Sequence, residues 1–145
     1  MNKQRMLVAL VVTDVFLAFS VIGAELFFQW TLPGSLRDYG HSRPFPPSSL
    51  WDLWILGLWA TTVMSTVVAW VGLVNLWWFA RRLYVFAWAT WILLTLVSGP
   101  AVLTPVGAMF DTVESVVGGL ILGLVYFSDL SRAFERPVAR VPATA

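Results

Sequence analysis

The chain has 145 residues, of which 59% are hydrophobic and only 12% are charged, whereas an average soluble domain has about 25% charged residues. The net charge of +1 gives no reason to expect nucleic acid as a partner. The sequence contains no cysteine, which excludes disulfides, thiol catalysis and thiolate metal sites. A single histidine, His41, likewise excludes a bis-histidine haem within one chain.

Four long apolar segments, separated by short polar gaps, organise the sequence: 6–30, 50–79, 83–99 and 106–127. A bilayer core about 30 Å thick is crossed by a helix of about 20 apolar residues, so each segment predicts a transmembrane helix. The predicted fold class is all-α, a polytopic membrane protein with a four-transmembrane-helix bundle. One domain is expected over residues 1–136, followed by a flexible tail over 137–145.

The first apolar segment could be misread as a secretory signal, because Lys3 and Arg5 precede it. A signal peptide has an apolar region of about 7–15 residues, but here the apolar run continues to Trp30. We therefore expect an uncleaved membrane anchor.

Two connections differ in character. Residues 31–49 contain six glycines and prolines, which argues against a long helix there. The link between the third and fourth segments, about 99–105, carries prolines and no charge. It could form a plain apolar turn or a short re-entrant piece.

Basic residues predict the orientation, because cytoplasmic loops are enriched in Lys and Arg. Seven lie on one predicted side and only Arg37 and Arg43 on the other; the seven are Lys3, Arg5, Arg81, Arg82, Arg132, Arg136 and Arg140. Both termini are therefore expected in the cytoplasm, with residues 31–49 outside, and the predicted location is the cell (inner) membrane.

Four acidic residues inside the predicted spans need an explanation: Asp14, Glu25, Asp111 and Glu114. Acids at membrane depth are costly and usually face the bundle interior. Helical spacing places Asp14 and Glu25 on one stripe, and depth predicts that Glu25, Asp111 and Glu114 meet in the outer half, with Asp14 alone in the inner half. This arrangement requires the first and fourth spans to pack together.

Several interpretations of these acids stay open. They could form a proton or cation site, or donate hydrogen bonds to Ser and Thr side chains on the second and third spans and so hold the bundle together. Asp111 could also cap the fourth helix. A di-iron site is disfavoured because its histidines are missing, and no metal or catalytic residue is predicted.

Small and aromatic residues give two further signals. Ser115, Gly119 and Gly123 recur every four residues, a spacing that lets helices approach closely, either inside the bundle or against a partner. Four tryptophans lie well inside the spans, where they could pack or line a pocket for a lipid, quinone or pigment: Trp59, Trp70, Trp88 and Trp91. No cofactor is otherwise predicted.

Two functions are consistent with these features. The first is a non-enzymatic integral membrane protein that acts as a subunit or accessory component of a larger assembly, with other membrane subunits or a second copy as partners. The alternative is a small proton- or cation-coupled transporter or channel that uses the buried carboxyls, as an oligomer. An enzyme acting on lipid is disfavoured because no nucleophile or phosphate motif is evident.

Overall fold

The structure, a computed structural model, describes residues 3–41, 50–98 and 102–135. Within them 89% of residues are helical and no strand occurs, so the all-α prediction is confirmed. Four helices are long and apolar enough to cross a membrane: α1 (Lys3–Phe27), α3 (Leu50–Val74), α4 (Ala80–Ser98) and α5 (Pro105–Phe127). The shorter elements are η1 (Gln29–Thr31), α2 (Gly34–His41) and η2 (Asp129–Phe134). The expected flexible tail, 137–145, lies outside the described residues.

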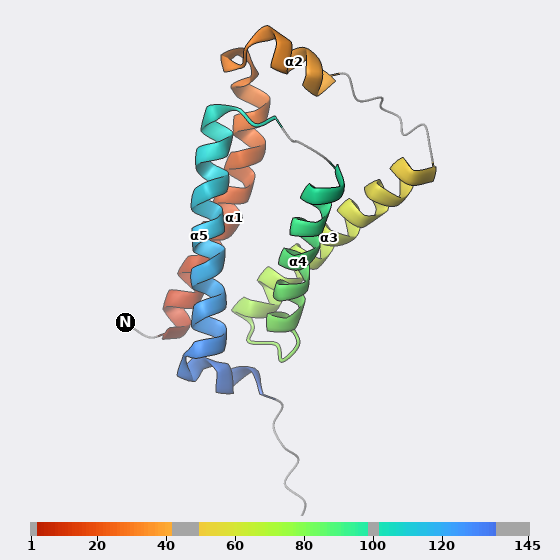
Figure 1. The fold of residues 1–145 in the computed structure, drawn as a ribbon. Helices are drawn as coiled ribbons and strands as arrows, with labels where there is room; N and C mark the ends of the chain where they lie inside the picture. Colours follow the sequence, from red (N-terminus) through yellow and green to blue (C-terminus); the bar gives the residue numbers. More distant parts are fainter. Residues whose placement is uncertain (1–2, 42–49, 99–101, 136–145) are drawn as a thin grey trace, which may run out of the picture.

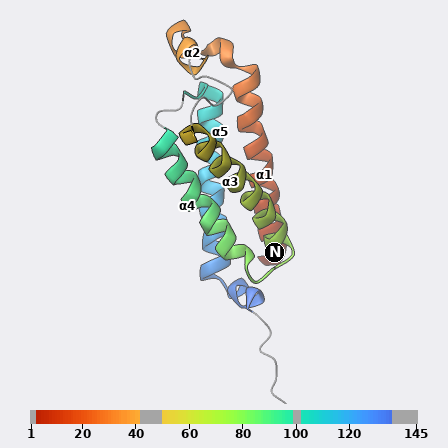
Figure 2. The same ribbon diagram turned by 90° about the vertical axis from the view of Figure 1, so that its right-hand side faces the viewer.

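The long helices form two antiparallel pairs, α1 with α5 and α3 with α4 (Figure 1). The view turned by 90° shows α3 and α4 on one side of the α1–α5 pair (Figure 2). The pairs approach each other near the end that carries the α3–α4 turn and η2, called the turn end below. They diverge toward the opposite end, which carries α2 (Figure 1). The predicted packing of the first span against the fourth is therefore confirmed.

The α1–α5 seam explains which residues of α1 are buried. Leu7, Val11, Asp14, Leu17 and Ala24 are the buried residues of α1, and they recur at intervals of three, four or seven. That spacing keeps one side of a helix turned toward a neighbour. Apolar side chains dominate the seam, and Asp14 is the buried acid within it.

The turn between α3 and α4 begins earlier than the hydrophobic run suggests, because α3 ends at Val74 and not near residue 79. Leu76 has a positive φ of 55°, and the N–H groups of Leu76 and Trp77 donate to the carbonyls of Leu73 and Gly72. This pattern is the Schellman motif that closes a helix with a left-handed residue. As a result, the two arginines predicted to form the turn lie in the first turn of α4 instead.

Gly72 permits the tight return of the chain at this turn. A Cβ at Gly72 would lie 2.7 Å from the Cβ of Ala80, a distance that two carbon atoms cannot adopt without a shift. The sequence signal for the turn was thus Gly72, two residues before the end of α3 and hidden in an apolar run.

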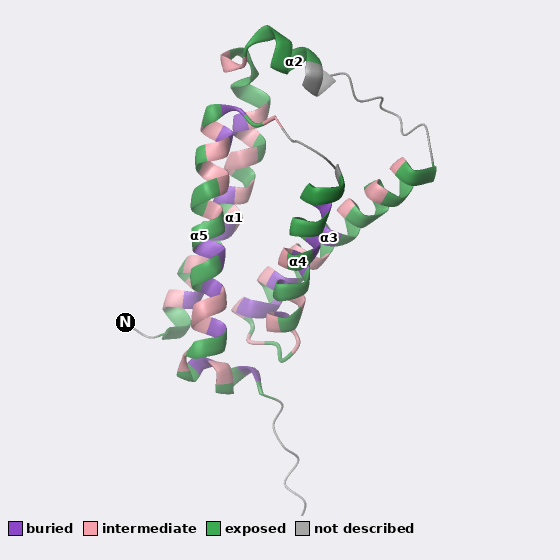
Figure 3. Ribbon diagram, in the orientation of Figure 1, coloured by how far each residue is buried: buried purple, intermediate pink, exposed green. Residues whose placement is uncertain are grey.

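Most of the apolar surface of the long helices is left uncovered. In the apolar 18-residue stretch of each helix, the share that is buried is 22% in α1, 17% in α3, 28% in α4 and 22% in α5. Exposed residues dominate the part of α3 nearest α2 (Figure 3). The loop over residues 31–49 was expected to lack a long helix. Its described part contains the short α2, which has eight residues.

Candidate functional site

Asp14 is the most deeply buried acid of the four, with 3% of its surface exposed. Its Oδ2 accepts hydrogen bonds from the Trp70 indole N–H at 2.8 Å and from the Tyr84 hydroxyl at 2.9 Å. Trp70 belongs to α3 and Tyr84 to α4. A single carboxyl oxygen on α1 therefore joins the two helix pairs.

The second oxygen of Asp14 is unusual, because Oδ1 is buried and has no hydrogen-bond partner among the described residues. A buried oxygen without a partner forgoes the hydrogen bonds it would make in water. A bound cation or an internal water would give this oxygen a partner, and a proton would lower the cost of burial by removing the charge.

Glu25 lies at the opposite end of the α1–α5 seam and contacts the start of α5. Its Oε1 accepts hydrogen bonds from the backbone N–H of Thr104 at 2.9 Å and from the Thr104 hydroxyl at 3.0 Å. The Thr104 hydroxyl oxygen in turn accepts from the Gly107 N–H at 3.0 Å and caps α5. Pro105 at the first helical position completes a common helix start.

This cap corrects one interpretation of the sequence. Asp111 does not cap α5, because the helix begins at Pro105, more than a turn earlier. The dipeptide Thr104-Pro105 carried the signal, since a capping residue followed by proline marks a helix start.

The antiparallel packing fixes the order of the four acids along the seam. Glu25 lies beside Gly107. Because α1 and α5 are antiparallel, residues of decreasing number in α1 are level with residues of increasing number in α5. Asp111 and Glu114 consequently lie between Glu25 and Asp14. At 1.5 Å per residue the line from Glu25 to Asp14 covers about 16 Å. Glu114 interacts electrostatically with both Asp14 and Asp111.

The register spaces the four acids along the seam. No group of three His, Cys, Asp or Glu side chains in the described parts of the chain could hold a metal ion, and Asp14, which was expected to be alone, interacts with Glu114. The antiparallel register explains the difference, because it spreads the acids along the seam by about one helical turn each. The acids therefore form a line.

Their partners also differ from those expected. The hydroxyls of Thr61, Thr62, Thr66, Thr90 and Thr95 donate to carbonyls of their own helices, as Ser and Thr commonly do within a helix. Their hydroxyl hydrogens are therefore not donated to the acids. Tyr84 was missed, and its signal was a hydroxyl-bearing aromatic residue in an apolar span, where a buried O–H needs an acceptor.

The four internal tryptophans fall into two pairs, one of Trp59 with Trp91 and one of Trp70 with Trp88, which both lie beside the Asp14–Tyr84 hydrogen bond. Trp59 and Trp91 stack edge to face, with ring centroids 4.7 Å apart. Trp70 donates to Asp14. Trp88 lies 6.5 Å from the Tyr84 ring and fills the space that a Cβ at Gly118 would need.

The small residues of α5 fall into two groups. Gly107 is buried against Glu25 of α1, and Gly118 is buried against Trp88 of α4. Ser115 and Gly119 are exposed and Gly123 is partly exposed, and no atom lies within 4 Å of a Cβ added at Gly119 or Gly123. These three residues, the open face of α5, are free to receive another helix.

Comparison with models of protein families, with curated proteins and with solved structures finds no match for this chain.

Proposed function

We propose that this chain is a non-enzymatic integral membrane protein that acts as a subunit or accessory component of a larger membrane assembly. Four apolar helices with largely uncovered surfaces support the membrane placement. The excess of basic residues near the turn end supports cytoplasmic termini in the cell (inner) membrane. The partner is another membrane subunit or a second copy.

The open face of α5 carries this proposal. Apolar side chains alone would cover a lipid-facing helix equally well, whereas small residues let a second helix approach closely enough for backbone contacts. Ser115, Gly119 and Gly123 share one side of α5 and have open space beside them.

A bulky residue on this face tests the proposal. Gly119→Leu should release the chain from a larger complex extracted in mild detergent, because a Cβ at this position has open space in the monomer whereas the bulky side chain would block a partner helix. Val116→Leu, at an exposed neighbouring position, is the matched control. A wild-type chain that extracts as a monomer, or a complex unchanged by Gly119→Leu, would reject the proposal.

The buried oxygen of Asp14 favours a second candidate function, a proton- or cation-coupled transporter or channel in which the chain works as an oligomer. The acids lie about one turn apart along the seam, and no Lys or Arg occurs between residues 6 and 36 or between 83 and 131 to neutralise them. Spaced carboxyl groups of this kind are typical of proton relays in membrane proteins.

Ion flux into liposomes distinguishes this candidate. The wild-type chain should carry an ion flux, and Asp14→Asn and Glu114→Gln should each abolish it. Asp129→Asn, at an exposed residue of η2, should leave the flux unchanged. Wild-type liposomes that behave like empty ones would exclude transport and leave the acids as structural groups.

A further inference from the structure

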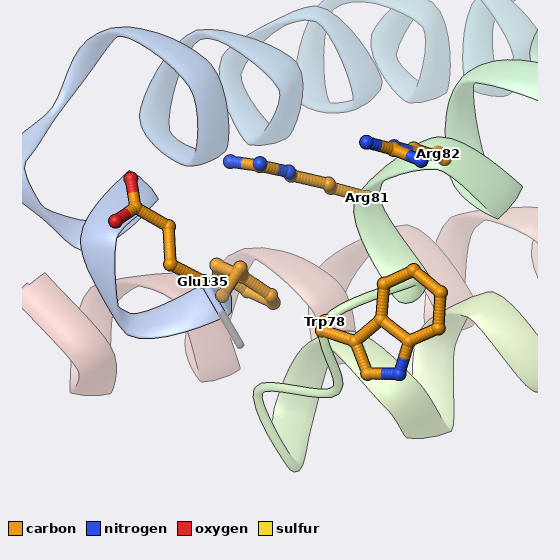
Figure 4. Close-up of a pocket in the computed structure, with 5 residues that line it drawn as sticks. Trp78, Arg81, Arg82 and Glu135 are labelled. Carbon is orange, nitrogen blue, oxygen red and sulfur yellow. The ribbon is translucent and has the colours of Figure 1, made fainter. Parts of the chain in front are cut away.

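A hollow of about 410 Å³ lies at the turn end, between the start of α4 and η2. It is lined by Trp78, Arg81, Arg82, Phe134 and Glu135. Figure 4 shows Arg81 extending from α4 toward η2, with Glu135 on the η2 side and Trp78 on the other. Phe134 is only 1% exposed, so its position is fixed by packing.

Arg81 is held in place by neutral groups. Its guanidinium donates to the Ser131 carbonyl at 3.4 Å and lies 5.6 Å from the centroid of the Tyr126 ring. The Tyr126 hydroxyl donates back to the Arg81 carbonyl at 3.3 Å. These contacts position the cation without neutralising it.

The charge at this hollow is unbalanced. Within the described ranges, Lys3 and Asp129 form an ion pair. Arg81, Arg82 and Glu135, which line the hollow, form no ion pair there. Both arginines lie in the first turn of α4, where the helix dipole is positive and disfavours cations. An anion bound there would interact favourably with both guanidinium groups and with the helix start.

We propose that this hollow binds the phosphate of an anionic phospholipid headgroup, with Arg82 and Arg81 as its ligands. The inference rests on the membrane placement proposed above. The hollow lies where α3 and α5 end and α4 begins, which is the level of lipid phosphates if these helices span the bilayer. Trp77 and Trp78, 42% and 41% exposed, mark the same level, because tryptophan favours the membrane interface.

A second hollow offers a path for the lipid's acyl chain. It has a volume of about 410 Å³. Its lining consists of Leu83 of α4 and five residues of α3, which are Ala60, Thr61, Met64, Ser65 and Val68. Leu83 directly follows Arg82, so the headgroup site and this mostly apolar surface adjoin in the sequence of α4.

Lipid binding by the full-length chain in detergent micelles tests the proposal. Dioleoyl phosphatidylglycerol should be retained in native mass spectra and should raise the melting temperature more than dioleoyl phosphatidylcholine does. Arg82→Gln should weaken phosphatidylglycerol binding about tenfold, the loss expected for a charge-assisted hydrogen bond. Glu135→Gln should strengthen it, because the carboxylate opposes the phosphate.

Arg5→Gln is the matched control, since Arg5 is exposed near the same end but does not line the hollow. Equal losses in Arg5→Gln and Arg82→Gln would indicate a diffuse charge effect and overturn the site. Equal stabilisation by both lipids, or by inorganic phosphate alone, would overturn a lipid headgroup as its ligand. Release of the chain from membranes by alkaline carbonate would instead contradict the membrane placement itself.

Discussion

At the scale of single residues, the central feature is the unequal use of the two Asp14 oxygens. Oδ2 receives two hydrogen bonds, from Trp70 and Tyr84, while Oδ1 receives none in the described structure. The carboxyl thus has one structural oxygen, which joins three helices, and one oxygen available for a proton, water or cation. A residue that served only as a structural link would not need the second oxygen unpaired.

Tyr84→Phe tests the structural half of this arrangement. The change removes one donor to a buried carboxyl without altering the ring, and should lower the stability of the fold by about 1–3 kcal/mol. Thermal unfolding in detergent measures the loss. Tyr126→Phe removes an exposed hydroxyl and should cost less; equal losses would show that the Asp14 bond is not special.

Gly118 is the residue where close approach matters most. A Cβ there would collide with the Trp88 indole, a rigid ring that cannot move as a flexible chain end can. Gly118→Ala should therefore destabilise the protein by about 1–3 kcal/mol, as overpacking does. Gly119→Ala, which has open space, should be neutral or slightly stabilising because alanine favours helix. Melting curves of the two variants decide the matter, and matching curves would contradict the contact.

At the scale of elements, the start of α5 couples two helices. Thr104 caps α5 and donates two hydrogen bonds to Glu25 of α1, so one residue secures both the helix end and the seam. The cap and the carboxyl should therefore depend on each other energetically.

Thr104→Ala should lower the free energy of unfolding by about 1 kcal/mol through loss of the cap alone. The total loss should be larger, because Glu25 also loses its hydroxyl partner. Thr104→Ser keeps the hydroxyl and should retain most of the stability. A double-mutant cycle with Glu25→Gln measures the coupling. Strictly additive losses in the cycle would show that the two side chains act independently.

Comparison of sequence and structure is most informative at this scale. The four helices followed from apolar length, and the α1–α5 contact followed from the cost of placing acids against lipid. The meeting of Glu25, Asp111 and Glu114 in the outer half stays a prediction, because depth estimates made helix by helix do not supply the register between two helices. That register depends on Thr104, Gly107 and Glu25, which meet at one end. The early end of α3 was equally hidden, since Leu76 adopts a left-handed conformation that its residue type disfavours.

At the scale of the whole molecule, Lys3 and Asp129 tie the start of α1 to η2. Lys3 Nζ lies 2.6 Å from Asp129 Oδ2, and this hydrogen bond lowers the pKa of Asp129 below its usual value. A lowered carboxyl pKa means that the contact contributes above the ordinary pKa of Asp and is lost as pH falls through the lowered value. Because both side chains are largely exposed, the contribution to stability should be small.

The measurable consequence is local. Spin labels on Arg5→Cys and Ala133→Cys, in a chain that otherwise lacks cysteine, should report a distance that broadens only when the pH falls through the lowered pKa of Asp129, which is below the usual Asp value of about 3.9. In an added Lys3→Met background the distance should be broad at neutral pH already. A distance that stays narrow in both cases would show that packing alone holds η2.

The orientation of the molecule is the last expectation, and it follows from charge. Seven basic residues belong to the predicted cytoplasmic side and two to the other, and the structure places Lys3, Arg81 and Arg132 at the turn end, opposite α2. A helix pair inserted with the turn end outside would carry most of its Lys and Arg across the membrane, which is strongly disfavoured for short loops. Single cysteines at Ser35, in α2, and at Ala133, in η2, are both exposed and should label from opposite sides with an impermeant thiol reagent. In intact cells only Ser35→Cys should react, and Ala133→Cys should react after permeabilisation. Labelling of both from outside would contradict the odd number of spans between them, α3, α4 and α5, and with it the four-span arrangement on which the headgroup site and the carboxyl line depend.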